Sequence, residues 1–270
     1  MNSSLYDKTF CALDIETTGV NPFKDKIIEI GIVRFRIGQE QNNTYQSLID
    51  PLIPVSEQSR LIHNISQEEL EGKPLYSDIY CSIKEFIEDS ILVIQNPQFD
   101  LSFIQSENRA AGLPFFSNRS FDTVSLAKKV FKGLKNHKLE TVSRHLNCIR
   151  NFHRALDDAF CCMDIFLEGV KRTDPGRIFT ISDLHNICGF DIQERVYKDV
   201  GSRKIRGVNI SPDKEYEIIY CDRAGQTTER KILCKKIIKN GSTYFVHAFC
   251  YLREQDRFFK FSRIKNATLC

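Results

Sequence analysis

The chain has 270 residues and a formal net charge of +3, and 41% of its residues are hydrophobic. This length allows one large domain or two smaller ones, and the hydrophobic content is too high for a disordered chain. No stretch approaches the roughly 18 apolar residues of a membrane-spanning helix. The first residues, MNSSLYDKTF, lack the basic and apolar segments of a signal peptide. We therefore expect a cytoplasmic protein with no membrane segment.

Charge is unevenly distributed along the chain. Residues 201–270 contain 15 Lys and Arg against 7 Asp and Glu, a balance of +8, whereas residues 1–200 have a balance of −5. A mildly acidic front and a basic rear indicate two domains with different roles. The alternative for the rear is an ordinary solvated basic face. The ten cysteines include no CxxC pair, so we expect reduced thiols rather than disulfides or a structural zinc site.

The front of the chain alternates strand and helix patterns. Apolar, β-branched runs predict strands at residues 9–16, 26–37, 43–50 and 90–96. Capping signals and helical spacing predict helices that begin at Ser66 and near Leu75, and others at residues 99–112, 121–131, 138–147 and 155–170. This mixture favours an α/β domain, which we place at residues 1–173.

The rear of the chain changes to strands. Residues 174–212 form a connector of uncertain structure, with a possible helix within 178–200 whose role stays open. Four strand patterns follow in residues 213–270, and the pairs Ala224-Gly225 and Asn240-Gly241 are typical of turns between strands. We expect a small all-β module that closes as a barrel.

Acidic residues recur at the ends of the predicted elements. Asp14 and Glu16 lie two residues apart in a strand, so both point to one face, where they repel each other unless a cation lies between them. Asp100 follows a strand at the start of a helix, and His153 and Asp158 stand at the entry to another helix. Oxygen ligands of this kind suit Mg²⁺ or Mn²⁺. We therefore expect two divalent metal ions.

These motifs, in this order, resemble those of the DEDD superfamily of 3′–5′ exonucleases, and within it the DnaQ-like group that includes the epsilon proofreading subunit and RNase T. The matching residues are Asp14, Glu16 and Thr17 for DxExT, Phe99 and Asp100 for the segment ending in FD, and His153, Ala155 and Asp158 for HxAxxD. The histidine places the resemblance in the DEDDh branch. The resemblance covers about residues 8–170 and implies a ribonuclease H-like fold.

The resemblance also implies a mechanism, in which two metal ions assist hydrolysis of the phosphodiester bond at a DNA or RNA 3′ end. Asp14 would bridge the ions, Glu16 and Asp158 would hold the ion that binds the attacking water, and Asp100 would complete the second site. His153 would take a proton from that water.

The expected partner is a single-stranded 3′ end, and the residues expected near its terminal nucleotide are Thr17, His63, Ile65, Asn96 and Phe99. For His63 and Ile65, ordinary packing is an equal alternative. One position departs from the family pattern, because Gln95 stands where DnaQ-like proteins commonly have a histidine. Gln95 keeps its hydrogen-bonding capacity but cannot carry a proton, which puts normal substrate contacts in doubt.

The rear resembles the WYL domain, a small Sm/SH3-like β-barrel. Tyr244-Phe245-Val246 stands at the signature tripeptide, and RFFKFSRI resembles a downstream motif of that family. The resemblance implies a site for nucleic acid or a nucleotide-like ligand, with these candidate residues: Arg230, Tyr244, His247, Arg257 and Arg263. Arginine suits phosphate because its planar guanidinium can donate two hydrogen bonds at once. The alternative is that the aromatic residues are core and the arginines are solvated.

The sequence as a whole predicts a metal-dependent 3′–5′ exonuclease joined to a WYL-like module. A regulatory protein that binds nucleic acid or senses a ligand, with a weakly active nuclease scaffold, is an alternative from another class. A replicative proofreading subunit is a second alternative, although the β module is unexpected there. The preference between DNA and RNA and the oligomeric state stay open.

Overall fold

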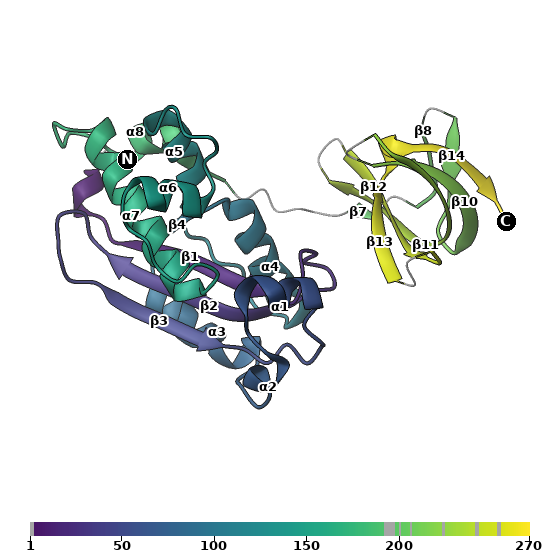
Figure 1. Cartoon of the computed structure of the whole chain (residues 1–270), viewed down its shortest axis with the longest axis horizontal. Coiled ribbons are helices and arrows are strands. Elements are labelled where there is room, and N and C mark those ends of the chain that lie inside the picture. The colour runs from purple at the N-terminus through teal and green to yellow at the C-terminus, as the bar shows by residue number, and fades with distance from the viewer. Residues whose placement is uncertain are drawn as a thin grey trace. The chain divides into compact units, whose positions relative to one another are not determined.

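The computed structural model describes residues 3–191, 198–199, 201–205, 207–222, 225–240, 243–252 and 255–270. The chain forms two compact units, residues 1–192 and 193–270, which are described separately (Figure 1). The first unit extends beyond the boundary expected at residue 173, because α8 (Ile181–Cys188) packs into its core and β6 (Gly189–Phe190) pairs with its sheet. No helix in the described ranges is long and apolar enough to cross a membrane.

A six-stranded sheet forms the centre of the first unit, in the order β3-β2-β1-β4-β5-β6. β1 pairs antiparallel with β2 and parallel with β4, and β5 continues the parallel part. The remaining bounds are β1 Phe10–Thr17, β2 Ile27–Phe35, β3 Asn43–Leu48, β4 Ile91–Ile94 and β5 Ser120–Asp122. The strands predicted in this part of the chain are therefore present, and the mixed sheet confirms the α/β class.

Helices cover both faces of this sheet. Their bounds are α1 Glu57–His63, α2 Gln67–Leu70, α3 Tyr76–Ile87, α4 Pro97–Ala110, α5 Thr123–Val130, α6 Leu139–His145 and α7 Ala155–Thr173, with a 3₁₀ turn at Leu5–Asp7. One hydrophobic core joins the sheet to α5, α7 and α8, and a second joins the opposite face to α3 and α4. The first unit is thus a three-layer α/β/α domain.

The alternation of side chains along β1 determines on which face of the sheet Asp14 and Glu16 lie. Phe10 and Ala12 lie in the core with α7, whereas Cys11 and Leu13 lie in the core with α3 and α4. Asp14 and Glu16 continue the even-numbered row. Their carboxyl groups therefore emerge on the α7 face, where the hydrophobic core ends.

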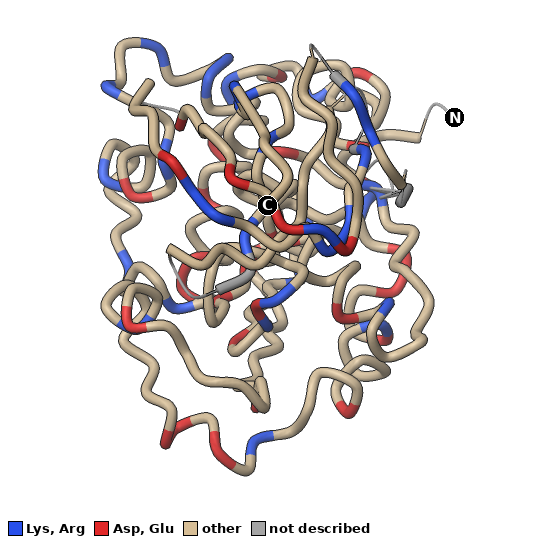
Figure 2. The backbone as a smooth tube through the Cα atoms, turned by 90° about the vertical axis from the view of Figure 1, so that its right-hand side faces the viewer, with Lys and Arg blue, Asp and Glu red and all other residues tan. Residues whose placement is uncertain are grey.

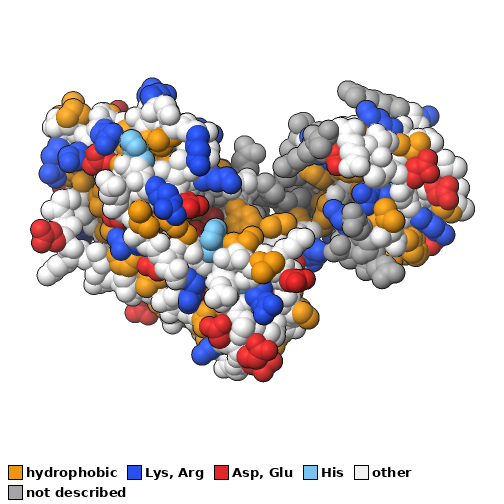
Figure 3. Space-filling model, viewed as in Figure 1, with side chains coloured by type: hydrophobic (Ala, Val, Ile, Leu, Met, Phe, Trp, Pro, Cys, Tyr) orange, Lys and Arg blue, Asp and Glu red, His pale blue; other side chains and the backbone are white. Residues whose placement is uncertain are grey.

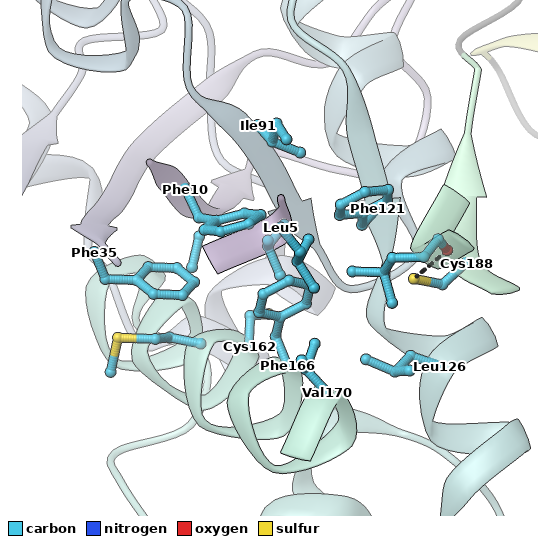
Figure 4. Packing of buried hydrophobic residues seen from close by; sticks show 14 of the residues in the cluster. Leu5, Phe10, Phe35, Ile91, Phe121, Leu126, Cys162, Phe166, Val170 and Cys188 are labelled. Carbon is cyan, nitrogen blue, oxygen red and sulfur yellow. Dashed lines mark hydrogen bonds between the residues drawn. The ribbon is translucent and has the colours of Figure 1, made fainter. Parts of the chain in front are cut away.

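Aromatic packing fixes α7 against the sheet. Figure 4 shows Phe166 of α7 among Phe10, Phe35 and Phe121 of three strands, and the ring centroids of Phe10 and Phe166 are 5.0 Å apart. Offset and tilted aromatic contacts of this kind stabilise a core beyond the area that they bury. The position of α7, and of the acid that it carries, is therefore set by a rigid apolar contact.

Gly31 allows the first turn of α7 to touch β2. A Cβ atom added at Gly31 would lie 2.2 Å from the Leu156 backbone nitrogen and 2.3 Å from the Ala155 carbonyl carbon. Gly31 is also paired with Asp14 across the sheet. The start of α7 can thus approach the end of β1 that carries Asp14 only because residue 31 has no side chain.

We predict that Gly31→Ala lowers the free energy of unfolding by at least about 2 kcal/mol, since the atoms that it would meet are backbone atoms that cannot rotate away. Urea unfolding followed by circular dichroism measures this. Gly176→Ala is the matched control, because an added Cβ there finds only the Ile178 side chain, at 3.8 Å. Equal stability of the two variants would contradict the close approach.

The second unit is an antiparallel sheet in the order β13-β12-β11-β10-β14. Its strands are β7 Lys198–Asp199, β8 Arg203–Ile205, β9 Val208–Ile210, β10 Lys214–Cys221, β11 Thr227–Asn240, β12 Thr243–Cys250, β13 Gln255–Lys260 and β14 Ile264–Leu269, with a 3₁₀ turn at Phe261–Arg263. Lys and Arg recur along these strands (Figure 2). The predicted all-β module is confirmed.

The predicted Sm/SH3-like barrel is not found. Within the described ranges the sheet is an open path from β13 to β14, and no pairing between these two strands closes it. The unit still has a hydrophobic core, and this core includes Ile218, Ile232, Val246 and Phe259 from the strands of the sheet. Ala224 and Gly241, from the two predicted turns, lie outside the described residues, although β11 and β12 pair antiparallel on either side of Gly241.

Candidate active site

Three segments distant in sequence bring the predicted acids together. β1 carries Asp14 and Glu16, the first turn of α4 carries Asp100, and the first turn of α7 carries Asp158. One ligand atom from each of Glu16, His153 and Asp158 lies within 4.8 Å of the others. Asp100 and Asp158 are 3% and 6% exposed, and the side chain of His153 stands on the open side.

Local structure at the start of α4 places Asp100. The helix begins at Pro97, a residue that suits the first turn because the missing N–H would have no partner there. Asn96, which precedes it, adopts a left-handed conformation with φ of 60°, and its N–H donates to Asp122 Oδ1 at 3.3 Å. Asp122 also caps α5. Asp122 therefore joins the start of α4 to the start of α5.

The loop before α7 places Asp158. The backbone N–H of His153 donates to Asp158 Oδ2 at 3.0 Å, and His153 itself has a left-handed backbone with φ of 65°. The second oxygen, Asp158 Oδ1, is buried and has no hydrogen-bond partner among the described residues. A buried carboxylate oxygen left without a partner is costly unless something positive binds it.

Burial and mutual repulsion raise the pKa of all four carboxyl groups. Desolvation contributes most at each group. It raises the pKa of Asp158 to about 7 and that of Glu16 and Asp100 to about 8, and the neighbouring acids add to the shift. The pKa of Asp14 is also well above its ordinary value, and the largest contribution after burial is the charge of Asp100. Near neutral pH these groups need either protons or a cation.

The donor set fits divalent metal ions. It consists of hard carboxylate oxygens and an exposed histidine, and one of these oxygens, Asp158 Oδ1, is buried without a hydrogen-bond partner among the described residues. Such oxygens are the ligands that Mg²⁺ and Mn²⁺ prefer. Asp14, Glu16, Asp100 and Asp158 are the residues that would hold the metal ions.

Glu29 is a fifth buried acid at this site, and the sequence motifs did not identify it. It is fully buried on β2 and is paired with Glu16 across the sheet. Arg154 donates to it through Nε and Nη2, at 3.2 and 2.9 Å. A charged residue inside the apolar run IIEIGIV was the signal that could have revealed it.

Not all residues predicted near the terminal nucleotide face the site. The Thr17 hydroxyl donates to the Gly19 carbonyl at 2.6 Å, and Ile65 is buried with Ile28 and Leu70. Ordinary packing therefore accounts for Ile65.

His63 is 3% exposed, and its Nδ1 accepts from the Ile65 N–H at 3.0 Å. Burial lowers the pKa of His63, and its weaker electrostatic neighbours include Glu29 and His153. His63 is thus a buried residue within electrostatic range of Glu29 and His153. Phe99 is partly buried at the start of α4, beside Phe103.

Gln95 takes a structural role at the departure from the family motif. Its Nε2 donates to the His137 carbonyl at 3.0 Å, and its Oε1 accepts from the Thr123 hydroxyl. The amide thus ties the end of β4 to α5 and to the loop before α6. Both polar ends of the Gln95 side chain therefore have partners within the protein.

The candidate residues of the β unit do not form one group. Arg230 and Arg257 lie on strands beside β12 and share the face of its core residues, since Arg230 Nη1 is 3.9 Å from Cys250 Sγ and Arg257 is paired with Ala248. His247 is on the opposite face and stacks on Phe258, with centroids 4.5 Å apart.

Two further candidates lie elsewhere in the β unit. Tyr244 Oη accepts from Arg203 Nη2 at 2.8 Å, a contact that was not predicted, and the guanidinium also covers the ring. Arg263 ends the 3₁₀ turn Phe261–Arg263.

A carboxylate cluster with a histidine at its rim, where β1 meets the first turns of α4 and α7, is the kind of site that a nuclease using divalent metal ions needs. The family profile described as "Exonuclease", that of RNase T, matches residues 11–166, and the WYL domain profile matches residues 210–269. The chain therefore belongs to the RNase T exonuclease family, and it carries a WYL domain. The DEDDh members of this family use two divalent metal ions.

Curated relatives are much longer than this chain. DNA polymerase III PolC-type of Thermotoga maritima is 36% identical over 189 residues, which is 69% of this chain and 14% of that protein. The PolC-type polymerase of Caldanaerobacter subterraneus subsp. tengcongensis is 30% identical over 179 residues, which is 66% of this chain and 13% of that protein. The match thus spans about an eighth of these relatives.

Solved structures show the same fold. Exonuclease X in complex with 5′ overhanging duplex DNA has a TM-score of 0.52 at 22% identity, over 66% of this chain and 98% of that one. The nuclease domain of 3′hExo, a DEDDh family member bound to rAMP, has a TM-score of 0.54 at 17% identity, over 61% of this chain and 92% of that one. The first unit therefore has the ribonuclease H-like exonuclease fold.

The raised pKa values predict that metal binding and pH jointly control stability. In the unfolded chain the pKa of a carboxyl group is about 4. In the folded chain the pKa is about 7 for Asp158 and about 8 for Glu16 and Asp100. The folded state binds more protons across this interval, so the free energy of unfolding of the metal-free protein falls as pH rises from about 4 to about 8. Mn²⁺ should therefore raise the melting temperature more at pH 8 than at pH 5.

Thermal melts in EDTA and in excess Mn²⁺ test this expectation. Asp158→Asn should weaken the response to Mn²⁺, and Asp157→Asn, which removes the same charge from the neighbouring residue, should preserve it. The same Mn²⁺-induced rise at both pH values would show that the four carboxyl groups do not take up the ion.

Proposed function

We propose that the chain is a 3′–5′ exonuclease that removes nucleotides from the 3′ ends of single-stranded DNA or RNA by two-metal-ion hydrolysis. The observation that carries the proposal is the convergence of Glu16, His153 and Asp158 within 4.8 Å, beside two further carboxyl groups. Names of similar proteins support it, since Exonuclease X was solved with DNA and 3′hExo with rAMP.

Each residue has a distinct part in this chemistry. Bound metal ions would supply positive charge to the phosphate oxygens and to the attacking water. Asp14, Glu16, Asp100 and Asp158 would hold these ions. His153 stands on the open side of the cluster, where an imidazole nitrogen can accept a proton from water and pass it to solvent.

The surface beside the site suits unpaired bases. Val20, three residues after Thr17, is 82% exposed, and Leu61 and Ile62 on α1 are 76% and 56% exposed. The Ser56 N–H, at the start of α1, donates to the Thr18 carbonyl at 3.1 Å, which ties these segments together. Hydrophobic side chains emerge among charged ones on the face of the first unit shown in Figure 3. Exposed aliphatic side chains beside the proposed metal site can make apolar contacts with the bases of a single strand.

The exonuclease proposal predicts how two site variants behave. Asp158→Asn should abolish release of a labelled 3′-terminal nucleotide, because it removes one metal ligand. His153→Ala should bind metal but cleave about 10²–10⁴-fold more slowly, the usual cost of losing a general base. Time courses with single- and double-stranded DNA and RNA, in Mg²⁺ or Mn²⁺, measure this and establish the substrate.

Asp157→Asn serves as the control, since it changes an acid one residue from Asp158 outside the set of proposed ligands. Release of the 3′ label at the wild-type rate by Asp158→Asn would exclude the proposed metal site. An inactive wild-type chain with intact metal binding would instead favour the regulatory scaffold considered from the sequence.

Proofreading is a second candidate function. The relatives named PolC-type polymerases favour it, since the match falls on a small part of each polymerase. A proofreading enzyme should remove a mispaired 3′ nucleotide from a primer–template duplex faster than a paired one. Equal rates on both duplexes would leave the general exonuclease as the better description.

For the β unit we propose binding of a nucleic-acid strand or a nucleotide-like ligand. Arg230, Tyr244 and Arg257 on or beside the inner face of the sheet, and Arg263 at its edge, are the proposed contacts, and Arg203 joins them through Tyr244. The charge balance of +8 in residues 201–270 supports an anionic partner. His247, on the opposite face, would need a separate contact.

This role predicts a salt-sensitive contribution to strand binding. Arg257→Ala in the full chain should raise KM for a long single strand several-fold with little change in kcat. It should also reduce the salt dependence of binding, because a protein that contacts fewer phosphates releases fewer counterions when it binds. Lys265→Ala, which removes the same charge from an exposed position on β14, is the control. Identical KM values for both variants and the wild type would argue for a solvated basic face.

A further inference from the structure

Glu29 is a charged side chain that the proposed metal chemistry does not use. Its side chain is 0% exposed, and it is paired in register with Glu16, one of the proposed metal ligands. Opposed acids on adjacent strands repel each other. An acid in this position requires a compensating group, and the structure shows which group that is.

The loop that carries His153 supplies this compensation. Arg154 Nη2 donates to Glu29 Oε1 at 2.9 Å, Arg154 Nε donates to Oε2 at 3.2 Å, and the Ala155 N–H donates to Oε2 at 3.0 Å. A guanidinium that grips a carboxylate at two points fixes orientation as well as distance. Glu29 thus holds two consecutive residues that directly follow His153.

Glu29 has no oxygen left for a metal ion. Oε2 accepts from Arg154 and from Ala155, and Oε1 accepts from Arg154 and, at 2.8 Å, from Gln46 Nε2. These four hydrogen bonds fill the usual accepting capacity of a carboxylate. The residue is therefore not a fifth ligand, although it lies beside Glu16.

The loop needs such an anchor because its conformation is strained. His153 is a non-glycine residue with φ of 65°, a conformation that persists only where the surroundings impose it. The His153 N–H donates to Asp158 Oδ2, so the same backbone turn sets both the histidine and a proposed metal ligand. Loss of the grip on Arg154 and Ala155 would let the turn relax.

We propose that Glu29 is a positioning residue, which clamps the loop 153–155 so that the His153 imidazole stays in place for proton transfer. This inference rests on the proposed exonuclease function. Small misplacements of a catalytic group can cost about 100-fold in rate. Glu29 therefore acts on the reaction through His153 and does not touch the substrate.

Glu29→Gln tests the clamp, since glutamine has the same shape but cannot form the charged two-point contact with Arg154. We expect kcat to fall about 10–100-fold while KM changes less than about 3-fold. Arg154→Lys, which keeps the charge but loses the two-point geometry, should give an intermediate kcat. Full wild-type kcat in Glu29→Gln would overturn the proposal.

Glu107→Gln is the matched control. Glu107 is also a buried acid near β2, which accepts from Lys26 Nζ at 2.9 Å and from the Ile27 N–H at 3.3 Å, but it lies on α4, and its hydrogen bonds among the described residues go to the start of β2 and not to the loop. This variant should lose stability as Glu29→Gln does, and kcat should stay within about 2-fold of wild type. Equal losses of kcat in both variants would reduce Glu29 to a general structural role.

A double variant separates positioning from stability. If Glu29 acts through His153, adding Glu29→Gln to His153→Ala should lower kcat less than about 3-fold further, because the group that it positions is already absent. The same 10–100-fold fall in both backgrounds would show that Glu29 acts by another route, and would overturn the clamp.

Limited trypsin digestion tests the clamp without relying on activity. The bond after Arg154 should be cut faster in folded Glu29→Gln than in the wild type or in Glu107→Gln, with the cleavage site identified by mass spectrometry. Equal cutting in all three would refute the clamp even if no nuclease activity were detected. An inactive wild type together with faster cutting in Glu29→Gln would refute the exonuclease and retain the clamp.

Discussion

Repulsion among four carboxyl groups that share a poorly solvated space is the constraint on which the first unit depends. Desolvation and the neighbouring charges raise the pKa of each group, so the arrangement opposes folding near neutral pH unless a cation is present. The protein balances this cost with apolar packing nearby. Phe166 of α7 stacks among the aromatic residues of the sheet, and Phe10 lies in the same row of β1 as Asp14.

β2 contributes as much to the site as the strand that carries the ligands. Gly31 lets the first turn of α7 approach the sheet, and Glu29 grips the loop that precedes this turn. Both residues are paired with proposed metal ligands, Gly31 with Asp14 and Glu29 with Glu16. The two adjacent strands therefore have different roles. β1 carries two of the proposed metal ligands, and β2 contacts the helix that carries a third, Asp158.

The sequence predicted which carboxyl groups lie together, because side-chain spacing and the order of the motifs carry that information. Side chains two residues apart in a strand share a face, so Asp14 and Glu16 had to meet, and the order of the motifs identified Asp100 and Asp158. Glu29 was missed because it belongs to no motif, and its role depends on a contact across 125 residues of sequence. The role of Gln95 could not be predicted from the sequence either, since its hydrogen-bond partners lie 28 and 42 residues away along the chain.

In the β unit, one feature could have been predicted from the sequence and another could not. The separation of His247 from Tyr244 follows from strand alternation, since residues three apart in a strand point to opposite faces, and the sequence could have given that answer. Arg203 could not be found in this way. It lies in a short strand within the predicted connector, and its contact with Tyr244 joins positions 41 residues apart.

The proposals for the two units rest on the electrostatics of the same kind of substrate. The exonuclease site concentrates negative charge, and a nucleic-acid strand is itself a polyanion, so the strand cannot approach the four carboxylates without cations. Metal ions supply positive charge at the reacting phosphate, but their effect is screened within about 10 Å at ordinary ionic strength. Phosphates further along the strand need other partners. A β unit with a balance of +8 can supply these, which gives a physical reason for joining a basic module to an acidic nuclease.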